Sequence, residues 1–213
     1  MFSLYYWDSV EVGKQYHKAK KGWAGNDVKK YKDYIFDLVQ KYQPATMLDY
    51  GCGRGEQYGI PVPYPTEVSG VYTEPMTFDQ FLGVHDIYKF DPCYKKFSKP
   101  PALDTKFDGV ICSQVLGSIP DYDIPTVIQV LNGHTEKFCF VSLIDPEFDT
   151  PKIGKDLYDA EYFKTWRTKK WYCEQFEKYW ADKPLYVFFK NKRSYNTNWI
   201  EENLEAKTLL KLN

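Results

Sequence analysis

The sequence predicts an α/β protein with a doubly wound, mostly parallel sheet. The middle of the chain alternates helical and strand patterns, which is typical of that class. Its strands at 107–113 ("FDGVICS") and 137–144 ("KFCFVSLI") have almost no polar interior, as expected for parallel strands that helices cover on both faces. A third strand, 46–50 ("TMLDY"), leads directly into a glycine loop, as the first strand of such a sheet does where it meets its ligand. The 213 residues fit a single domain, 1–213.

The first part of the chain, residues 1–25, has a mixed composition and a basic cluster, "HKAKKGWAG", with two glycines near its end. We expect this segment to fold over the ligand site as a lid. The next segment, 26–42, is predicted as a helix because its apolar residues recur at helical spacing. Asn26 or Asp27 can cap the first turn, and Pro44 ends the helix.

The central part of the chain begins with an irregular stretch. Residues 59–85 carry four prolines and are predicted as a surface insertion. The segment 86–92 ("DIYKFDP") is predicted as a strand that stops at its proline. A helix is predicted at 120–133, with a capping aspartate, a first-turn proline and a terminal glycine: Asp121 or Asp123, Pro125 and Gly133.

The last part of the chain, 150–213, is rich in aromatic residues. The segment 159–180 carries three tryptophans and is predicted as a helix. A strand is predicted at 185–192 ("LYVFFKNK"), and an acidic-to-basic helix at 199–211.

Bulk properties limit the classes of partner. Basic and acidic residues nearly balance, 28 against 29, so the formal net charge is −1. That balance gives no electrostatic argument for wholesale binding of nucleic acid. Five cysteines occur without CxxC or Cys/His spacing, so we expect free thiols in a reducing compartment and no metal site. No apolar run has the length of a signal peptide or a membrane span, so we expect a cytoplasmic protein that does not contact membranes.

The loop "DYGCGRGE", 49–56, is the most informative stretch. A dinucleotide-binding loop would read GxGxxG and a P-loop would end in Gly-Lys-Ser/Thr, and the chain has neither pattern here. Asp49 and Glu56 would also repel a diphosphate. An acid directly before bare backbone suits a ligand with a positive end. S-adenosylmethionine carries an ammonium and a sulfonium group and meets that requirement.

The stretch "LDYGCGRG" resembles motif I of the class I S-adenosylmethionine-dependent methyltransferases. The ordered set of "DYGCGRGEQY", "FDP", "KPP" and "KFDGVICSQVLGSIP" is similar to a group of methyltransferase-like proteins common in bacteriophage genomes. The resemblance implies a Rossmann-like, seven-strand-type sheet and methyl transfer from S-adenosylmethionine to an unidentified acceptor, with S-adenosylhomocysteine as product. It also implies a phage-encoded protein in the host cytoplasm. In motif I the acid and the loop backbone hold the methionine moiety, which assigns to cofactor binding Asp49, Tyr50, Gly51, Cys52, Gly53 and Gly55.

Two further segments complete the expected cofactor site. The adenosine ribose needs a carboxylate at the end of the second strand, where Asp91 and Pro92 stand. Asp86 competes for that role but precedes the strand. The insertion accounts for the long separation of Asp91 from the glycines. By the resemblance, the third strand ends in a loop that faces the ligand, which adds to the site Cys112, Ser113, Gln114 and Leu116.

One departure from the phage group follows the third strand. Its members read "VLEHIP" there, whereas this chain reads "VLGSIP", so Gly117 and Ser118 replace a Glu-His pair. A histidine at that place is the natural general base for an oxygen or nitrogen acceptor. Its absence keeps a second function open: an S-adenosylmethionine-binding protein that transfers another group, degrades the cofactor or only binds it.

The remaining candidates for chemistry are few. His17, in the expected lid, is the one catalytic candidate, whereas His85 precedes the second strand and His134 ends a helix. The pair in "DPCY" is misplaced for a cytosine-C5 nucleophile, and the amino-methyltransferase signature is absent after "FDGVIC". The segments "HKAKK" and "WRTKKWYCEQF" support a third hypothesis, a nucleic-acid-modifying methyltransferase, although a solvated face and core packing also explain them.

Overall fold

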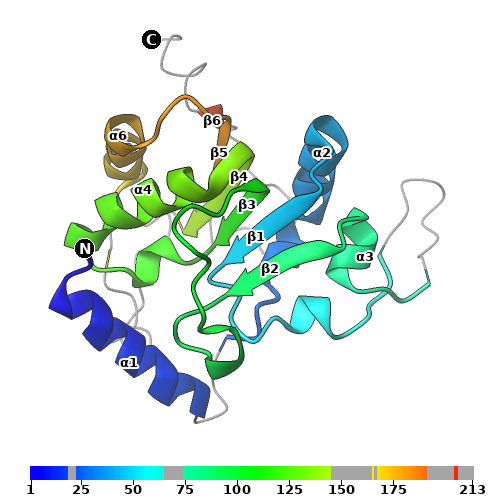
Figure 1. Cartoon of the computed structure of the whole chain (residues 1–213), viewed down its shortest axis with the longest axis horizontal. Helices are drawn as coiled ribbons and strands as arrows, with labels where there is room; N and C mark the ends of the chain where they lie inside the picture. Colours follow the sequence, from blue (N-terminus) through cyan, green and yellow to red (C-terminus); the bar gives the residue numbers. More distant parts are fainter. Residues whose placement is uncertain (19–22, 65–73, 145–164, 166, 191–203, 206–213) are drawn as a thin grey trace.

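A six-stranded sheet, in the order β2-β1-β3-β4-β5-β6, is the centre of the described part of the molecule (Figure 1). The structure is a computed structural model, and it describes residues 1–18, 23–64, 74–144, 165, 167–190 and 204–205. The first five strands pair in parallel, and β6 pairs antiparallel with β5. The strands are Thr46–Tyr50 (β1), Asp86–Phe90 (β2), Phe107–Ser113 (β3), Thr135–Ile144 (β4), Leu185–Lys190 (β5) and Leu204–Glu205 (β6).

The order of the parallel strands confirms a doubly wound α/β sheet. The order 2-1-3-4-5 is one of the two common doubly wound orders, and it places the topological switch between β1 and β3. The prediction of a seven-strand-type sheet was wrong, because the described residues hold six strands. Between β2 and β3 the chain has three prolines and a single 3₁₀ turn, Lys95–Phe97, and no strand among the described residues extends the sheet beyond β2.

Helices cover both faces of the sheet. On one face lie α2 (Lys32–Tyr42), α3 (Phe78–Leu82) and the 3₁₀ turn Asp27–Tyr31. On the other face lie α1 (Leu4–Lys18), α4 (Ile124–His134) and α6 (Lys169–Tyr179). Figure 1 shows α4 and α6 together on one side and α2 on the other.

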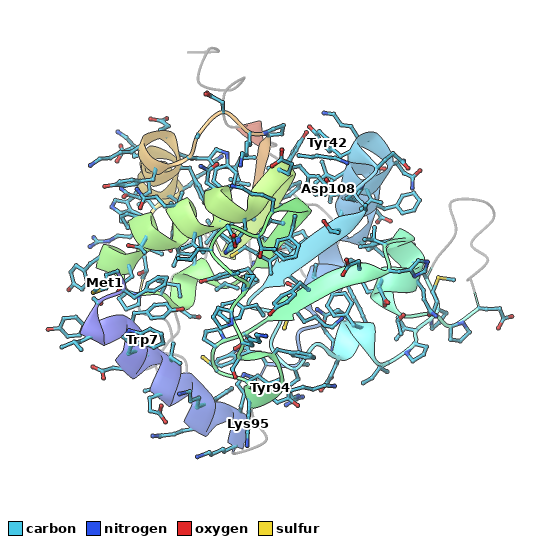
Figure 2. The ribbon with its side chains drawn as sticks, in the orientation of Figure 1. Met1, Trp7, Tyr42, Tyr94, Lys95 and Asp108 are labelled. Carbon is cyan, nitrogen blue, oxygen red and sulfur yellow. The ribbon has the colours of Figure 1, made fainter. Side chains whose placement is uncertain are left out.

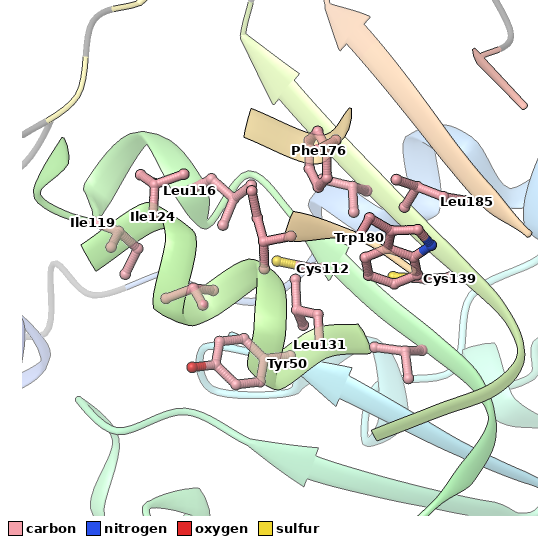
Figure 3. Packing of buried hydrophobic residues seen from close by; sticks show 14 of the residues in the cluster. Tyr50, Cys112, Leu116, Ile119, Ile124, Leu131, Cys139, Phe176, Trp180 and Leu185 are labelled. Carbon is pink, nitrogen blue, oxygen red and sulfur yellow. The ribbon is translucent and has the colours of Figure 1, made fainter. Parts of the chain in front are cut away.

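Successive residues of the buried strands contribute to two cores. In β3, Ile111 belongs to the core under α2, whereas Cys112 belongs to the core under α4 and α6. Figure 3 shows Cys112 and Cys139 among the apolar side chains of that second core, which include Leu131, Phe176 and Trp180. Burial raises the pKa of both thiols, so they remain neutral hydrophobic groups. Cys52 is also buried, whereas Cys93 and Cys173 are half-buried, and all five thiols are free.

The N-terminal segment forms a long helix, α1, that packs against the rest of the domain. Ser3 caps it, since the Ser3 hydroxyl accepts a hydrogen bond from the backbone N–H of Tyr6 at 3.2 Å. Ser3 also donates from its backbone N–H to the Asp123 carboxylate at 2.8 Å, and its hydroxyl donates to the same group. Midway along α1, a Cβ on Gly13 would lie 2.4 Å from Cys93 Sγ. That this helix opens and closes as a lid stays a prediction.

The close approach of Gly13 to Cys93 gives a testable stability effect. We expect Gly13→Ala to lower the free energy of unfolding by about 1–3 kcal/mol through overpacking, although alanine normally stabilises a helix. A Cβ on Gly13 would also lie 2.9 Å from Cys93 Cβ, so only a Cys93→Gly background removes both contacts, and there the same substitution should be neutral or stabilising. Chemical denaturation of the four proteins measures both effects. Equal losses in the two backgrounds would contradict the contact.

Several predicted boundaries differ from the structure. The helix predicted at 26–42 begins as the 3₁₀ turn Asp27–Tyr31, and the Asn26 side chain donates to Glu56 at 3.2 Å instead of capping it. Asp123 occupies the N-cap position of α4, but its carboxylate accepts hydrogen bonds from Ser3 instead of capping the helix. The helix continues past Gly133 to His134. The insertion 59–85 contains a Val62–Met76 bridge and α3.

The prediction for the C-terminal part was partly wrong. Leu204–Glu205 is not helical but pairs as β6 with Tyr186–Val187. An edge strand such as β5 exposes unpaired backbone groups, and a tertiary pairing of this kind overrides a local helical pattern. The other residues of the helix predicted at 199–211 lie outside the described residues. Of the helix predicted at 159–180, the structure describes α6, Lys169–Tyr179, whereas Thr165, Arg167 and Thr168 are not helical, so the prediction was wrong there. Thr168 caps α6 by accepting from the backbone N–H of Trp171 at 3.2 Å.

None of the described helices combines the length and the apolar character that a membrane span requires.

Candidate functional site

The candidate site lies at the carboxyl ends of β1, β2 and β3. In Figure 1 the arrowheads of these strands point toward the side of the sheet where α1 lies. Doubly wound sheets bind ligands at this edge, beside the switch between β1 and β3. A cavity opens there. The sequence-predicted residues that line it are Asp49, Gly51, Cys52, Asp91, Pro92, Ser113 and Gln114.

Other predicted residues lie nearby but do not line this cavity. Tyr50, Cys112 and Leu116 are at most 3% exposed and belong to the core under α4. Strand alternation sends Tyr50 and Cys112 to that face. Gly53 and Gly55 lie in the glycine loop without forming part of the cavity wall.

The glycines of the loop are required by left-handed backbone and by close packing against the protein itself. Gly51 has a φ of +84°, and a Cβ on it would lie 2.1 Å from Val115 Cγ2. Gly53 has a φ of +58°, and its Cβ would lie 2.6 Å from the Trp23 carbonyl oxygen. L-residues with a side chain rarely adopt such φ values. The expectation that the glycines serve direct approach of the ligand therefore applies to Gly51 alone, which lines the cavity.

The backbone N–H groups of the loop all donate within the protein. Those of Gly51 and Cys52 donate to the Phe90 carbonyl, and those of Arg54 and Glu56 to the carbonyls of Trp23 and Ala24. The Gly53 N–H donates to Asp91, and the Gly55 N–H to the Cys52 carbonyl. The loop then enters a single 3₁₀ turn, Glu56–Tyr58, rather than a long helix. A phosphate site needs free N–H groups at a helix N-terminus, so this loop is not built for phosphate.

Asp91 is a fixed acceptor at the end of β2. Its Oδ2 accepts the Gly53 N–H and its Oδ1 the Cys93 N–H, both at 2.8 Å. The residue is 7% exposed and lines the cavity. Burial raises the pKa of the carboxyl, against the effect of these hydrogen bonds. A carboxylate offers about four lone-pair positions, so two remain for a ligand.

Asp49 supplies a second buried carboxyl, from β1. Its Oδ2 accepts from the Gln57 amide and from the Tyr58 hydroxyl, each at 2.9 Å. The residue is 2% exposed, and burial outweighs the two hydrogen bonds and raises the pKa to about 7. Asp49 therefore gains or loses its charge near neutral pH, at the wall of the cavity.

The end of β3 supplies a polar wall held in a strained backbone conformation. Gln114 has a φ of +59°, although it is not glycine. Its backbone N–H donates to the Ser142 carbonyl at 2.9 Å, and its side-chain amide donates to the Tyr31 hydroxyl at 3.2 Å. The Ser113 and Ser142 hydroxyls lie 2.9 Å apart. Residues in such backbone regions cluster at ligand sites.

The strain at Gln114 predicts a specific order of stability. Gln114→Gly and Gln114→Ala both remove the side-chain hydrogen bonds, but only glycine adopts a φ of +59° without cost. We expect the glycine variant to be more stable than the alanine variant by about 1 kcal/mol. Thermal unfolding of the pair checks this, and an alanine variant at least as stable as the glycine variant would contradict it.

The rest of the cavity wall was not predicted residue by residue. It comes from α1, from the segment after it, from the turn Glu56–Tyr58 and from the residues beyond β2 and β3. Among these residues only Gly25 carried a signal in the sequence, because a glycine often marks a backbone conformation that other residues avoid. Gly25 has a φ of +78°, and a Cβ on it would lie 2.0 Å from the Cys52 carbonyl oxygen. The unpredicted lining residues are Tyr6, Ser9, Val10, Trp23, Gly25, Asp27, Val28, Gln57, Cys93, Val115, Ser118 and Ile119.

The catalytic candidate His17 lies next to the cavity but not in its wall. Its ring lies 5.5 Å from the Trp23 ring and 5.2 Å from the Tyr94 ring. Figure 2 places Tyr94 near the C-terminal end of α1. Neither ring nitrogen has a hydrogen-bond partner in the described structure. Burial lowers the pKa of His17, whereas the charge of Asp91 acts in the opposite direction.

The other sequence candidates have structural explanations. His134 is buried, and its Nδ1 lies 2.8 Å from the Thr105 carbonyl oxygen. Burial raises the pKa of Cys93 to about 12, so its thiol is not an activated nucleophile. In the tryptophan-rich segment, Arg167 pairs with Asp121, and Trp171 packs against the core. Most of the run "HKAKK" lies outside the described residues, and within the described residues no cluster of three or more His, Cys, Asp or Glu side chains is arranged to hold a metal ion.

Fold and site together define an α/β protein with a cavity at the carboxyl edge of its parallel strands. Comparisons with models of known protein families, with curated proteins and with solved structures gave no match for this chain.

Proposed function

We propose that the protein binds S-adenosylmethionine in this cavity and transfers its methyl group to an acceptor. One observation carries the proposal: two buried carboxyls, Asp49 and Asp91, face a cavity beside a glycine loop whose N–H groups are all used internally. The loop cannot cradle a phosphate, whereas the carboxyls suit a ligand with hydroxyls and a positive charge. A Rossmann-like arrangement and the resemblance of motif I support the same ligand.

The residues divide the work of binding. Asp91, whose two oxygens are held by the Gly53 and Cys93 N–H groups, accepts hydrogen bonds from the ribose hydroxyls. Asp49, when ionised, stabilises the positive methionine end. When bound, the cofactor supplies a methyl carbon already activated by its sulfonium. The protein contributes mainly position and exclusion of water, and residues of α1 and of the segment 23–28 line the cavity.

Calorimetric titration tests the cofactor. We expect S-adenosylmethionine and S-adenosylhomocysteine to bind, and ATP and NAD to bind at least about 100-fold more weakly because no free N–H groups receive their phosphates. ATP is a matched control, since it carries the same adenosine. Equal affinity for ATP and S-adenosylhomocysteine would overturn the proposal.

A second function is favoured by one feature of the cavity. No histidine lines its described wall, and Ser118 stands in the position that the resemblance gives to a general base. On this second hypothesis, the protein binds the cofactor and breaks it down, transfers another of its groups or only holds it. Mass spectrometry of the products separates the two functions. S-adenosylhomocysteine that forms only with an acceptor supports methyl transfer, whereas breakdown without an acceptor supports the second function.

A further inference from the structure

The two buried carboxyls of the cavity wall have no cationic partner within the described part of the chain. Asp49 accepts hydrogen bonds from a side-chain amide and a tyrosine hydroxyl, and Asp91 accepts from two backbone N–H groups. All four donors are neutral. The ion pairs of the described residues include neither carboxyl. Each carboxylate, when ionised, is therefore a buried charge that only neutral donors offset, which is costly.

The basic side chains near these carboxyls are engaged with other groups. Lys89 acts on the charge of Asp49, but its Nζ donates to a backbone carbonyl at 3.1 Å and lies 4.9 Å from the centre of a tyrosine ring. Arg54 pairs with a neighbouring glutamate at 2.6 Å. Burial lowers the pKa of His17, which favours the neutral imidazole, although the charge of Asp91 opposes that shift. The cavity thus presents two carboxyls whose counter-charge a ligand can supply.

Both carboxyls hold their protons more tightly than an exposed aspartate does. Burial raises the pKa of Asp49 to about 7 and also raises the pKa of Asp91. The charge of Asp91 is a further cause of the raised pKa of Asp49, so the two groups act on each other. A cation that binds between them favours their ionised forms. Binding of such a ligand is therefore linked to the release of protons.

The positive sulfur of S-adenosylmethionine joins the two parts of the molecule that these carboxyls hold in the proposed complex. Asp91 accepts hydrogen bonds from the ribose hydroxyls, and Asp49 stabilises the methionine end. Because the sulfur is bonded to both parts, a cofactor held in this way has its sulfonium between the two carboxyls. S-adenosylhomocysteine lacks one methyl group, and its sulfur is neutral. The two ligands carry the same ammonium and carboxylate groups, so their charges differ only at the sulfur.

We propose that Asp49 and Asp91 act together as a charge-specific pair, which binds S-adenosylmethionine more tightly than S-adenosylhomocysteine because only the cofactor has a positive sulfur. The inference rests on the proposed cofactor and adds a property of the same site, the ready release of the product. Once the sulfur is neutral, the pair no longer attracts it, and S-adenosylhomocysteine is a weak inhibitor. A site that recognised only the nucleoside and the amino-acid end would bind both ligands equally, since specificity is a difference of affinities.

Three ligands of nearly equal shape test the preference by calorimetric titration at pH 7.5. Sinefungin has a carbon that bears an ammonium group in place of the methylated sulfur, so it keeps the positive charge without the reactive methyl. We expect S-adenosylmethionine and sinefungin to bind at least about tenfold more tightly than S-adenosylhomocysteine. Binding of S-adenosylhomocysteine that is as tight as that of sinefungin overturns the inference. If none of the three binds, the cofactor assignment fails instead, so the two failures are distinguishable.

A count of released protons gives a second readout. Titrations at pH 7 in phosphate and in Tris, two buffers with different ionisation enthalpies, measure the protons that leave on binding. Because the pKa of Asp49 is about 7, we expect S-adenosylmethionine to release about half a proton more per site than S-adenosylhomocysteine does. The affinity preference should also decline as the pH falls below 7, because a protonated carboxyl does not attract the sulfonium. Equal proton release by the two ligands contradicts the inference.

Two variants separate the pair from the other acid of the cavity wall. Asp49→Asn keeps an acceptor oxygen but cannot ionise, so we expect the preference to fall below about threefold and the difference in proton release to disappear. Asp27→Asn is the matched control. Asp27 also lines the cavity, but its half-exposed carboxylate already pairs with Lys30, so this variant should keep the wild-type preference within about twofold. A preference that is unchanged in Asp49→Asn overturns the inference.

Discussion

Asp49→Asn should make the protein more stable than the wild type at pH 8 and equally stable near pH 4. Burial raises the pKa of Asp49 to about 7, whereas an unfolded aspartate titrates near 4. The folded state therefore holds this proton more tightly than the unfolded state does. The stability that the protonated group contributes is complete below the unfolded pKa, and it is lost as the pH rises to about 7.

The size of that loss follows from the separation of the two pKa values. It amounts to about 2–4 kcal/mol at pH 8, and asparagine avoids it because an amide does not ionise. The amide oxygen can still accept from Gln57 and Tyr58, as Asp49 does. Denaturant unfolding of both proteins from pH 4 to pH 8 measures the difference. Asp33→Asn, at an exposed position on α2, is the control and should follow the wild-type profile.

The same variant should bind the cofactor less well. At pH 8 the ionised Asp49 stabilises a positive ligand, so we expect Asp49→Asn to lower the affinity for S-adenosylmethionine about tenfold, and by less at pH 6. A gain in stability with a loss of binding is the expected signature of a residue kept for function. Unfolding profiles of wild type and variant that run parallel from pH 4 to pH 8 would contradict the account of Asp49.

The strands and the edge of the sheet where the site lies were predictable from local patterns. Short apolar runs such as 46–50 and 107–113 need burial on both faces, and that requirement alone indicates a parallel sheet covered by helices. The position of Asp91 at the end of its strand likewise needs only the sequence. These features depend on residues that are close together in the sequence, so they can be predicted without knowledge of the fold.

The composition of the cavity wall depends on contacts between distant segments. The carbonyls of Trp23 and Ala24 accept hydrogen bonds from the backbone N–H groups of Arg54 and Glu56. No residue pattern in 1–25 predicts these hydrogen bonds. Tyr50 and Cys112 were assigned to the site because a motif indicates only which segment of the chain forms the site. The alternation of side chains along a strand decides which residues of that segment reach the cavity. The helix predicted at 199–211 failed at Leu204–Glu205 for a related reason, a pairing with the sheet edge.

The contacts of the glycine loop change how its sequence is interpreted. Its spacing predicts bare backbone for a ligand, but most of that backbone is used for packing and for internal hydrogen bonds. The side chains of Asp49 and Asp91 line the cavity, and in the proposed complex they contact the ligand. If the proposed ligand binds, its recognition depends on these acceptors, since the N–H donors of the loop are already occupied.

Asp91→Ala should have the largest effect on cofactor binding. Two hydrogen bonds from ribose hydroxyls to a charged acceptor are lost, so we expect the affinity for S-adenosylhomocysteine to fall at least about 100-fold. The variant also leaves the Gly53 and Cys93 N–H groups without their acceptor, which costs about 1–3 kcal/mol of stability for each group. Asp91→Asn, which retains one acceptor oxygen, should lose less stability.

A double-mutant cycle separates direct ribose contact from damage to the loop. The 2′-deoxy analogue of S-adenosylhomocysteine should bind the wild type about tenfold more weakly than the parent compound, and should bind Asp91→Ala as well as the parent does. Asp86→Ala, at the exposed opposite end of β2, is the matched control and should keep the wild-type preference. If loss of the 2′-hydroxyl weakens binding equally in wild type and Asp91→Ala, the ribose is held elsewhere. A residue that only shapes the loop cannot abolish the contribution of one ligand hydroxyl to the binding free energy.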